Sequence, residues 1–301
     1  MTFPNIGKRL LFVIPAIPIA WWVINASPFS ISPAWPAVIR PIRPGHILII
    51  VLSFLACWEY IGMLRILYPR NGFWISYIWL ALHFVLYFFD IQPPHYAAFW
   101  VLLLLVAVEA FGWGRFKKTR RWMRASLLFI GVAIIYMCAA ALLNFYNEAF
   151  QKLFPRIFEA PMFSQLGICL VILAVCMCDS GAYFIGCSFG KRRFSIISPR
   201  KTIEGAIGGF VAAVLTASVG WLFLADPRLP KGLGILLGVL IGIFAQIGDL
   251  FVSLMKRYFR VKDSSHLIPG HGGILDRFGS LFFTAPAISI FSWIVSRIIH
   301  I

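Results

Sequence analysis

Residues 232–248 read GLGILLGVLIGIFAQIG and contain no charged side chain. A helix needs about 20 mostly apolar residues to cross the hydrocarbon core of a bilayer, so this stretch and its neighbours predict a membrane-spanning helix. The glycines favour close approach of neighbouring helices. The whole chain has the same character, because 60% of its 301 residues are hydrophobic and only 13% are charged. A soluble domain carries about 25% charged residues.

The apolar segments predict an all-α, polytopic integral membrane protein with about nine transmembrane helices. They are too many and too long for the core of one soluble domain. The predicted spans are 10–26, 45–66, 73–89, 97–111, 126–145, 164–187, 203–224, 232–254 and 280–299.

The net charge of +16 is unevenly distributed. Most of the 27 Lys and Arg residues fall at the N-terminus or in loops after even-numbered spans, chiefly in 115–124, 191–201 and 256–277. Short loops rich in Lys and Arg stay in the cytoplasm, so we expect a cytoplasmic N-terminus. The basic charge then reflects topology, with loop 115–124 also attracting anionic lipid headgroups of the bilayer. It does not indicate a nucleic-acid partner.

Two regions differ in composition. Residues 1–160 predict an N-terminal transmembrane bundle of about five helices, with few polar residues inside its spans. Residues 161–301 have Gly-rich spans and most of the chain's 11 acidic residues. We therefore expect the chemistry in the second region, around a cytoplasmic loop at 255–279.

Carboxylates, basic side chains and glycines meet around this loop. Asp249 and Asp276 lie at the membrane edge, where a carboxylate costs free energy and usually has a function. Carboxylates without ligand-spaced His or Cys suit a hard ion such as Mg²⁺. Glycines let the backbone approach a phosphate or adopt a positive φ. Metal, basic side chains and a Gly-rich loop together indicate phosphoryl or nucleotidyl transfer.

Plainer interpretations exist for some of these residues. Lys256, Arg257, Arg260 and Lys262 equally suit ordinary positive-inside residues. His271 in its Gly-rich turn suits a local hydrogen bond better than metal ligation.

The sequence resembles the CTP:phosphatidate cytidylyltransferase family, the CDP-diacylglycerol synthases. The resemblance extends over about residues 174–280 and has three blocks: CDSGAYFIGCSFGK, ISPRKTIEGAIGG and the signature. The matched signature residues are Ser253, Lys256-Arg257, Lys262-Asp263, Pro269-Gly270-His271-Gly272-Gly273 and Asp276-Arg277. One position departs, since the final Asp of the family signature is Gly279 here.

The resemblance implies an Mg²⁺-dependent nucleotidyltransferase of phospholipid biosynthesis, with CTP and phosphatidate as substrates and CDP-diacylglycerol and pyrophosphate as products. The attacking phosphate is already an oxyanion, so charge stabilisation and positioning supply the catalysis. It also implies a bacterial-type inner (plasma) membrane location with the active site facing the cytoplasm. A second, monovalent cation such as K⁺ is compatible with it.

Residue roles follow from resemblance and placement. Asp249, Asp276, Lys262 and Asp263 are the expected catalytic residues, and Asp249, Asp276 and Asp263 are the expected metal ligands. The expected substrate-binding residues are Ser198, Lys201, Thr202, Ser253, Lys256, Arg257, Gly270, His271, Gly272, Gly273 and Arg277. Asp179 either orients a lysine or joins the metal network.

Two other functions fit parts of the pattern. A CTP-dependent lipid kinase acting on a polyprenol would use similar metal- and phosphate-binding residues and would release CDP. A transporter would place carboxylates at the membrane midplane on broken helices, whereas here they gather at one face. Gly-rich faces are also compatible with a homodimer.

Overall fold

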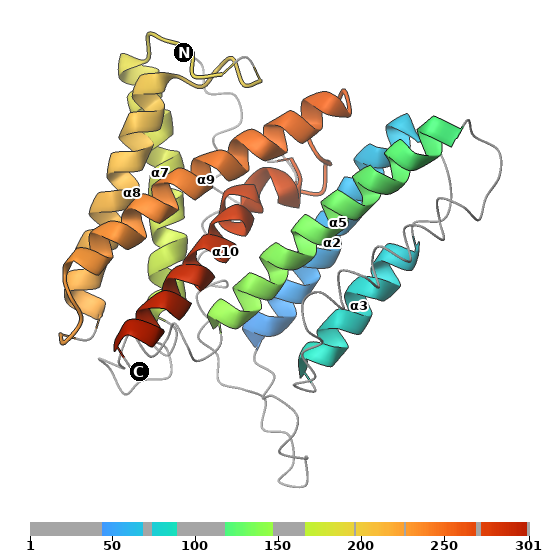
Figure 1. Cartoon of the computed structure of the whole chain (residues 1–301). Helices are drawn as coiled ribbons and strands as arrows, with labels where there is room; N and C mark the ends of the chain where they lie inside the picture. Colours follow the sequence, from blue (N-terminus) through green and yellow to red (C-terminus); the bar gives the residue numbers. More distant parts are fainter. Residues whose placement is uncertain are drawn as a thin grey trace, which may run out of the picture.

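The computed structural model describes residues 44–68, 74–88, 118–146, 166–195, 197–225, 227–268 and 272–299. Within these ranges every regular element is a helix, and pairing between extended segments is limited to two isolated bridges. The helices, shown in Figure 1, are α2 (Pro44–Leu67), α3 (Trp74–Phe88), α5 (Lys118–Tyr146), α7 (Leu166–Phe189), α8 (Ile203–Leu224), α9 (Gly232–Tyr258) and α10 (Ile274–Ile299).

The all-α prediction is confirmed for this part of the chain, and each predicted span within it coincides with a helix. Spans 10–26 and 97–111 lie outside the described residues. In the described residues, five helices are long and apolar enough to cross a membrane: α2, α7, α8, α9 and the Ile274–Val295 part of α10.

The predicted ends of α9 and α10 were wrong. α9 continues to Tyr258 and α10 begins at Ile274, so the connecting loop is 259–273 and shorter than the predicted 255–279. Hydropathy identifies only the apolar part of a helix, while the polar ends continue as helix beyond it. Asp276 therefore belongs to the first turn of a helix, where a negative charge is favoured by the helix dipole.

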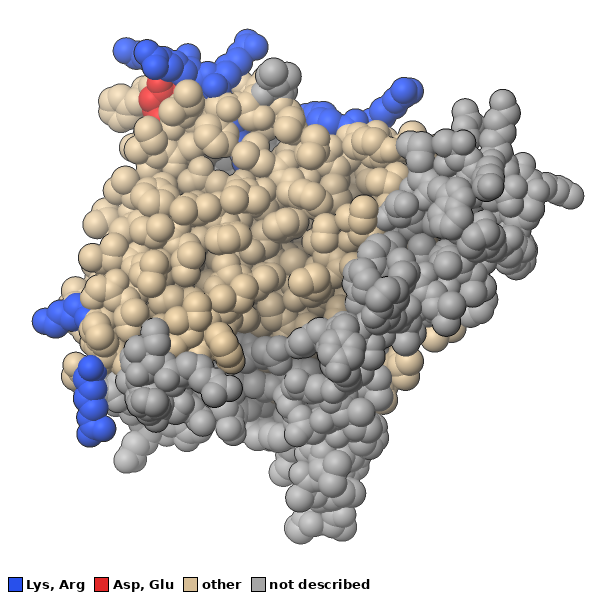
Figure 2. Space-filling view, in the orientation of Figure 1, with Lys and Arg blue, Asp and Glu red and all other residues tan. Residues whose placement is uncertain are grey.

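The surface of α8 is arranged for a lipid environment. Its buried side is made of small residues at every fourth position, and its exposed side is made of large apolar residues with the same spacing. The buried residues are Gly205, Gly209, Ala213 and Ala217, and the exposed ones are Ile207, Val211, Leu215 and Val219. Such a continuous apolar surface is unfavourable in water. Figure 2 shows Lys and Arg at opposite ends of the described surface, with an uncharged belt between them.

Small residues bring α7, α8 and α9 into close contact. A Cβ added at Gly209 of α8 would lie 2.5 Å from the carbonyl oxygen of Cys178 on α7. A Cβ added at Gly238 of α9 would lie 2.6 Å from Cα of Val214 on α8. The prediction that the Gly-rich spans pack closely is thereby confirmed.

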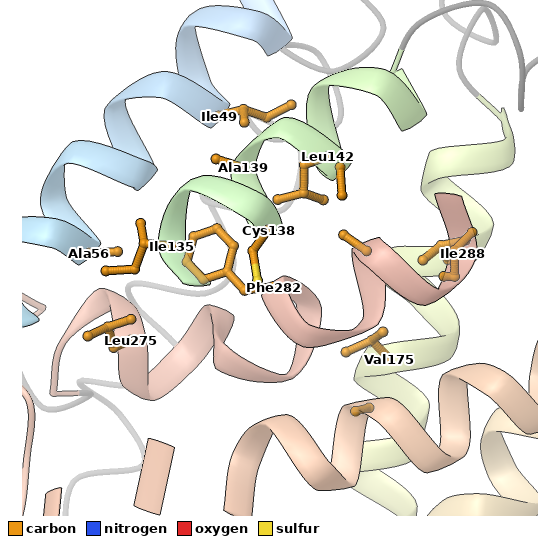
Figure 3. Packing of buried hydrophobic residues seen from close by; sticks show 14 of the residues in the cluster. Ile49, Ala56, Ile135, Cys138, Ala139, Leu142, Val175, Leu275, Phe282 and Ile288 are labelled. Atoms are coloured by element: carbon orange, nitrogen blue, oxygen red, sulfur yellow. The ribbon is translucent and has the colours of Figure 1, made fainter. Parts of the chain in front are cut away.

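α10 joins this group of helices to α2 and α5. On one side the ring of Phe283 of α10 packs at a tilt against that of Phe251 of α9, with ring centroids 4.8 Å apart. On the other side Ser289 Oγ donates to the carbonyl oxygen of Ala141 on α5, over 3.1 Å. Figure 3 shows α5 side chains such as Ile135 and Cys138 packing between α2 and α10. α10 therefore lies between the two halves of the chain.

Candidate active site

The C-terminus of α9 turns the chain sharply after two basic residues. The Val261 N–H donates to the carbonyl oxygen of Lys256 over 2.9 Å, and the Arg260 N–H donates to that of Arg257 over 3.1 Å. Arg260 has φ 60°, so the helix ends in a Schellman motif with arginine at the left-handed position that glycine usually occupies. The turn directs the following loop back toward α10.

Asp276 organises the N-terminus of α10. Its Oδ2 accepts hydrogen bonds from the Gly273 N–H (3.0 Å), the Ser264 N–H (2.8 Å) and the Ser264 hydroxyl (2.9 Å). The bond to Gly273 is one half of a capping box, in which the third helical residue accepts from the residue before the helix. Its Oδ1 pairs with Lys256 Nζ at 2.5 Å, and the two side chains are only 9% and 17% exposed.

The other half of this cap comes from a distant helix. Glu59 of α2 is 1% exposed and accepts the N–H groups of Ile274 (2.6 Å) and Leu275 (2.9 Å). The Ser265 hydroxyl donates to the same carboxylate over 2.7 Å. The Ser264 hydroxyl lies 2.9 Å from it and shares its single proton between Glu59 and Asp276. Glu59 thus occupies the place of an N-cap side chain, which Gly273 lacks.

Glycine is required where the loop reaches α10. Gly272 has φ 85°, as expected from its place in the Gly-rich turn, and its carbonyl oxygen accepts the Ile268 N–H over 2.9 Å. A Cβ at Gly273 would lie 2.5 Å from Glu59 Oε2 and would overlap Ser264 Oγ. The neighbouring Pro269, Gly270 and His271 lie outside the described residues.

A second ion pair joins Asp249 of α9 to Lys201. Lys201 belongs to loop 190–202, where its carbonyl oxygen accepts the Phe194 N–H over 2.8 Å. Thr202 caps α8 by accepting the Gly205 N–H over 3.1 Å. Glu204 accepts the backbone N–H of Lys191 at 3.1 Å. These bonds fold the loop back on the start of α8 and hold Lys201 beside α9.

Asp179 of α7 belongs to the same group. It lies close enough to Asp249, Lys201 and Arg277 for their charges to act on it, and Ser280 of α10 is also nearby. Asp276 and Ser280 are four residues apart and so share one face of α10. Asp179 of α7 and Asp249 of α9 therefore lie near the face of α10 that carries Ser280 and Asp276.

The expected site residues differ in how closely they gather. The structure pairs Lys201 with Asp249 and Lys256 with Asp276. The side chains of Arg257, Lys262, Asp263 and Arg277 are exposed, and those of Ser198 and Ser253 are half-buried. In the part of the chain that the structure describes, no three Asp, Glu, His or Cys side chains converge into a ready metal cage. Two carboxylates with substrate phosphates are nevertheless sufficient for Mg²⁺, which rarely occupies an all-protein cage.

Glu59 was missed at the sequence level. It is the only acidic residue of α2, a mostly apolar helix whose other charged residue is Arg65 in the last turn. The rule that drew attention to Asp249 and Asp276, that carboxylates inside a membrane are expensive, applies equally to Glu59. It was overlooked because the chemistry was expected in residues 161–301 alone.

Comparison with known families now bears on this geometry. Residues 19–295 match the model of the cytidylyltransferase family. This chain belongs to the cytidylyltransferase family. The resemblance read from the three sequence blocks is therefore confirmed, and the match extends beyond them to include α2 and Glu59.

Several proteins named phosphatidate cytidylyltransferase are similar to this member of the cytidylyltransferase family. The one from Staphylococcus haemolyticus is 45% identical over 124 residues, which are 41% of this chain and 47% of that protein. The one from Bacillus subtilis is 46% identical over 119 residues, 39% of this chain and 43% of that protein. The matched region thus spans about half the length of these relatives. The one from Staphylococcus saprophyticus is 30% identical over 207 residues, 66% of this chain and 78% of that protein.

Proposed function

We propose that this protein is a phosphatidate cytidylyltransferase, which forms CDP-diacylglycerol and pyrophosphate from CTP and phosphatidate. The observation that carries the proposal is the pair of lysine–aspartate contacts, Lys201–Asp249 and Lys256–Asp276, at one end of an apolar bundle. The family match and the names of the relatives support it. Such a site can receive a lipid from the bilayer and a nucleotide from water.

The reaction needs charge stabilisation more than proton transfer. A phosphatidate oxygen attacks the α-phosphorus of CTP, and the bond from that phosphorus to the pyrophosphate oxygen breaks. The exposed side chains of Arg257, Lys262 and Arg277 are suited to bind the phosphates. Lys201 and Lys256 add positive charge beside the carboxylates, and the Gly272–Gly273 turn lets the backbone approach the nucleotide. Positioning two polyanions in line supplies much of the remaining rate enhancement.

Magnesium is part of the proposal. The carboxylate oxygens of Asp249 and Asp276 are the donors that this ion prefers, and Asp179 adds a third carboxylate near Asp249. When bound, the ion would neutralise the charge developing on the transferred and leaving phosphates. Metal ligation by Asp263 and the binding of a monovalent cation such as K⁺ stay predictions. Contact of Ser198 and Thr202 with the nucleotide also stays a prediction.

The location is also proposed. We expect a multi-pass protein of a bacterial-type inner membrane, with the N-terminus and the site in the cytoplasm, because the basic loops lie on the side of the site. The glycines of α8 and α9 described above pack within the chain. A homodimer therefore stays a prediction, and its interface would have to be formed by another surface of the protein.

The decisive assay supplies purified protein in micelles with phosphatidate, Mg²⁺ and CTP labelled at the α-phosphate. We expect label in the lipid fraction, and none with EDTA or with the Asp249→Asn or Asp276→Asn variant. Lys231→Met, at the opposite end of α9, serves as the matched control and should keep full activity. If folded wild-type protein transfers no label, the proposed function is wrong. Label moving to a polyprenol from γ-labelled CTP would identify the kinase instead.

A further inference from the structure

We infer that Glu59, on a helix outside all three signature blocks, is a positioning residue that sets the orientation of Asp276. The inference rests on the proposed function only for its kinetic consequence. Its structural content, that Glu59 holds loop 259–273 and the start of α10 in place, can be tested without any substrate.

Both carboxylate oxygens of Glu59 accept hydrogen bonds. Oε1 accepts the Ile274 N–H and the Ser265 hydroxyl. Oε2 accepts the Leu275 N–H and lies 2.9 Å from the Ser264 hydroxyl, whose proton it shares with Asp276. The first backbone N–H groups of a helix have no partner within the helix and must be satisfied elsewhere. A buried carboxylate is tolerated in an apolar helix when donors surround it in this way.

Two routes connect Glu59 to Asp276. The first runs through Ser264, whose hydroxyl lies 2.9 Å from both Glu59 Oε2 and Asp276 Oδ2. The second runs through the α10 backbone, because Glu59 holds the two residues immediately before Asp276. Together they engage Asp276 Oδ2 with the loop and leave Oδ1 directed at Lys256. A displaced Glu59 would therefore rotate or release the carboxylate that we propose for metal binding.

A local cap could not replace this arrangement. Gly273 has no side chain, and a Cβ there would collide with the carboxylate that Glu59 supplies. The cap must come from another element, and it comes from a helix 215 residues earlier in the sequence. The site is therefore built from both halves of the chain.

The informative variant is Glu59→Gln. Glutamine keeps the size of the side chain but replaces one carboxylate oxygen with an NH₂ group. This group only donates, so it cannot accept the hydrogen bonds from the backbone N–H and the hydroxyl that it faces. Tyr60→Phe is the matched control: it removes the 2.6 Å bond from Tyr60 to the carbonyl oxygen of Leu127 on α5, next to Glu59 in the sequence. It keeps the ring that packs edge-on against Phe259 at the start of the loop, with ring centroids 5.8 Å apart.

Hydrogen exchange on the full-length protein gives the structural readout. We expect amide exchange across residues 262–280 to be about tenfold faster or more in Glu59→Gln, since loss of a hydrogen bond to a charged group has about that effect on an equilibrium. Tyr60→Phe should leave this segment unchanged. Wild-type exchange in Glu59→Gln would overturn the inference. So would equal acceleration in Tyr60→Phe, because a general loosening of α2 would then explain it.

Kinetics give the second readout. In Glu59→Gln we expect kcat to fall about tenfold or more and the Mg²⁺ concentration for half-maximal activity to rise, with KM for phosphatidate within about twofold of wild type. Glu59→Asp keeps both carboxylate oxygens on a shorter side chain. Its kcat and its Mg²⁺ requirement should therefore lie between those of wild type and those of Glu59→Gln. If folded Glu59→Gln has the kcat and the Mg²⁺ requirement of wild type, Glu59 contributes only to stability. That result would overturn the inference. If wild type transfers no label while the exchange difference persists, the proposed function fails and the positioning is supported.

Discussion

The two lysine–aspartate pairs differ in burial, and this separates their contributions to stability. Lys201 and Asp249 are 30% and 39% exposed, so water screens their attraction and the pair contributes at most about 1 kcal/mol. Lys256 and Asp276 are far less exposed. Breaking a buried pair leaves a desolvated charge without its partner and costs about 3–5 kcal/mol, less here because Asp276 keeps its other donors.

We therefore predict that Lys256→Met and Lys201→Met each reduce cytidylyl transfer strongly, about 100-fold, but that only Lys256→Met lowers the thermal unfolding midpoint clearly. Unfolding in detergent and the α-label assay on the same preparations would check this. Equal midpoints for the two variants would contradict the difference in burial.

Gly279, where the family signature has Asp, is explained by packing. A Cβ at this position would lie 2.6 Å from Val252 Cγ2, and a Cβ at Gly248 would lie 2.8 Å from the Gly279 carbonyl oxygen. α9 and α10 thus approach each other too closely here for a larger residue. We predict that Gly279→Asp destabilises the protein by about 1–3 kcal/mol, the usual range for overpacking. Adding Val252→Ala should recover part of that loss, which paired unfolding measurements would detect.

At the scale of elements, the contact between α8 and α9 depends on a single glycine face. Gly238→Ala would place a Cβ 2.6 Å from backbone Cα of Val214, which cannot move unless the helices separate. We expect a loss of about 1–3 kcal/mol. Gly232 at the start of α9 has nothing within 4 Å, so Gly232→Ala should be close to neutral. Similar stabilities for both alanine variants would mean that the helices are not packed this closely.

The helices were predictable and their junctions were not. Hydropathy located α7 and α8 almost to the residue, because their apolar stretches fill the whole helix. It misplaced the end of α9 and the start of α10, where polar residues such as Lys256 and Asp276 are held in helix by caps and ion pairs. The signature identified most site candidates by their local spacing. Glu59 could not be connected to them, because its partners lie about 200 residues away and only tertiary packing brings them together.

For the whole molecule, the distribution of charge predicts which end faces the cytoplasm. Cys187 is exposed near the C-terminus of α7, on the side of the site, and Lys231 is exposed at the other end of α8 and α9. With the remaining native cysteines replaced, a membrane-impermeant maleimide should label Cys187 only in inside-out vesicles. A Lys231→Cys variant without Cys187 should be labelled only in right-side-out vesicles. The reverse pattern would invert the topology and move the proposed site to the outer face.

The cap that Glu59 provides also has a consequence for biosynthesis. A chain emerging from the ribosome delivers Glu59 to the membrane about 200 residues before Ser264, Ser265, Ile274 and Leu275. Until those residues arrive, the carboxylate has none of the hydrogen-bond donors that surround it in the folded protein. Assembly of loop 259–273 therefore has to wait for α10. We therefore expect a chain that stops before α10 to hold most of the signature residues and yet to lack the proposed activity.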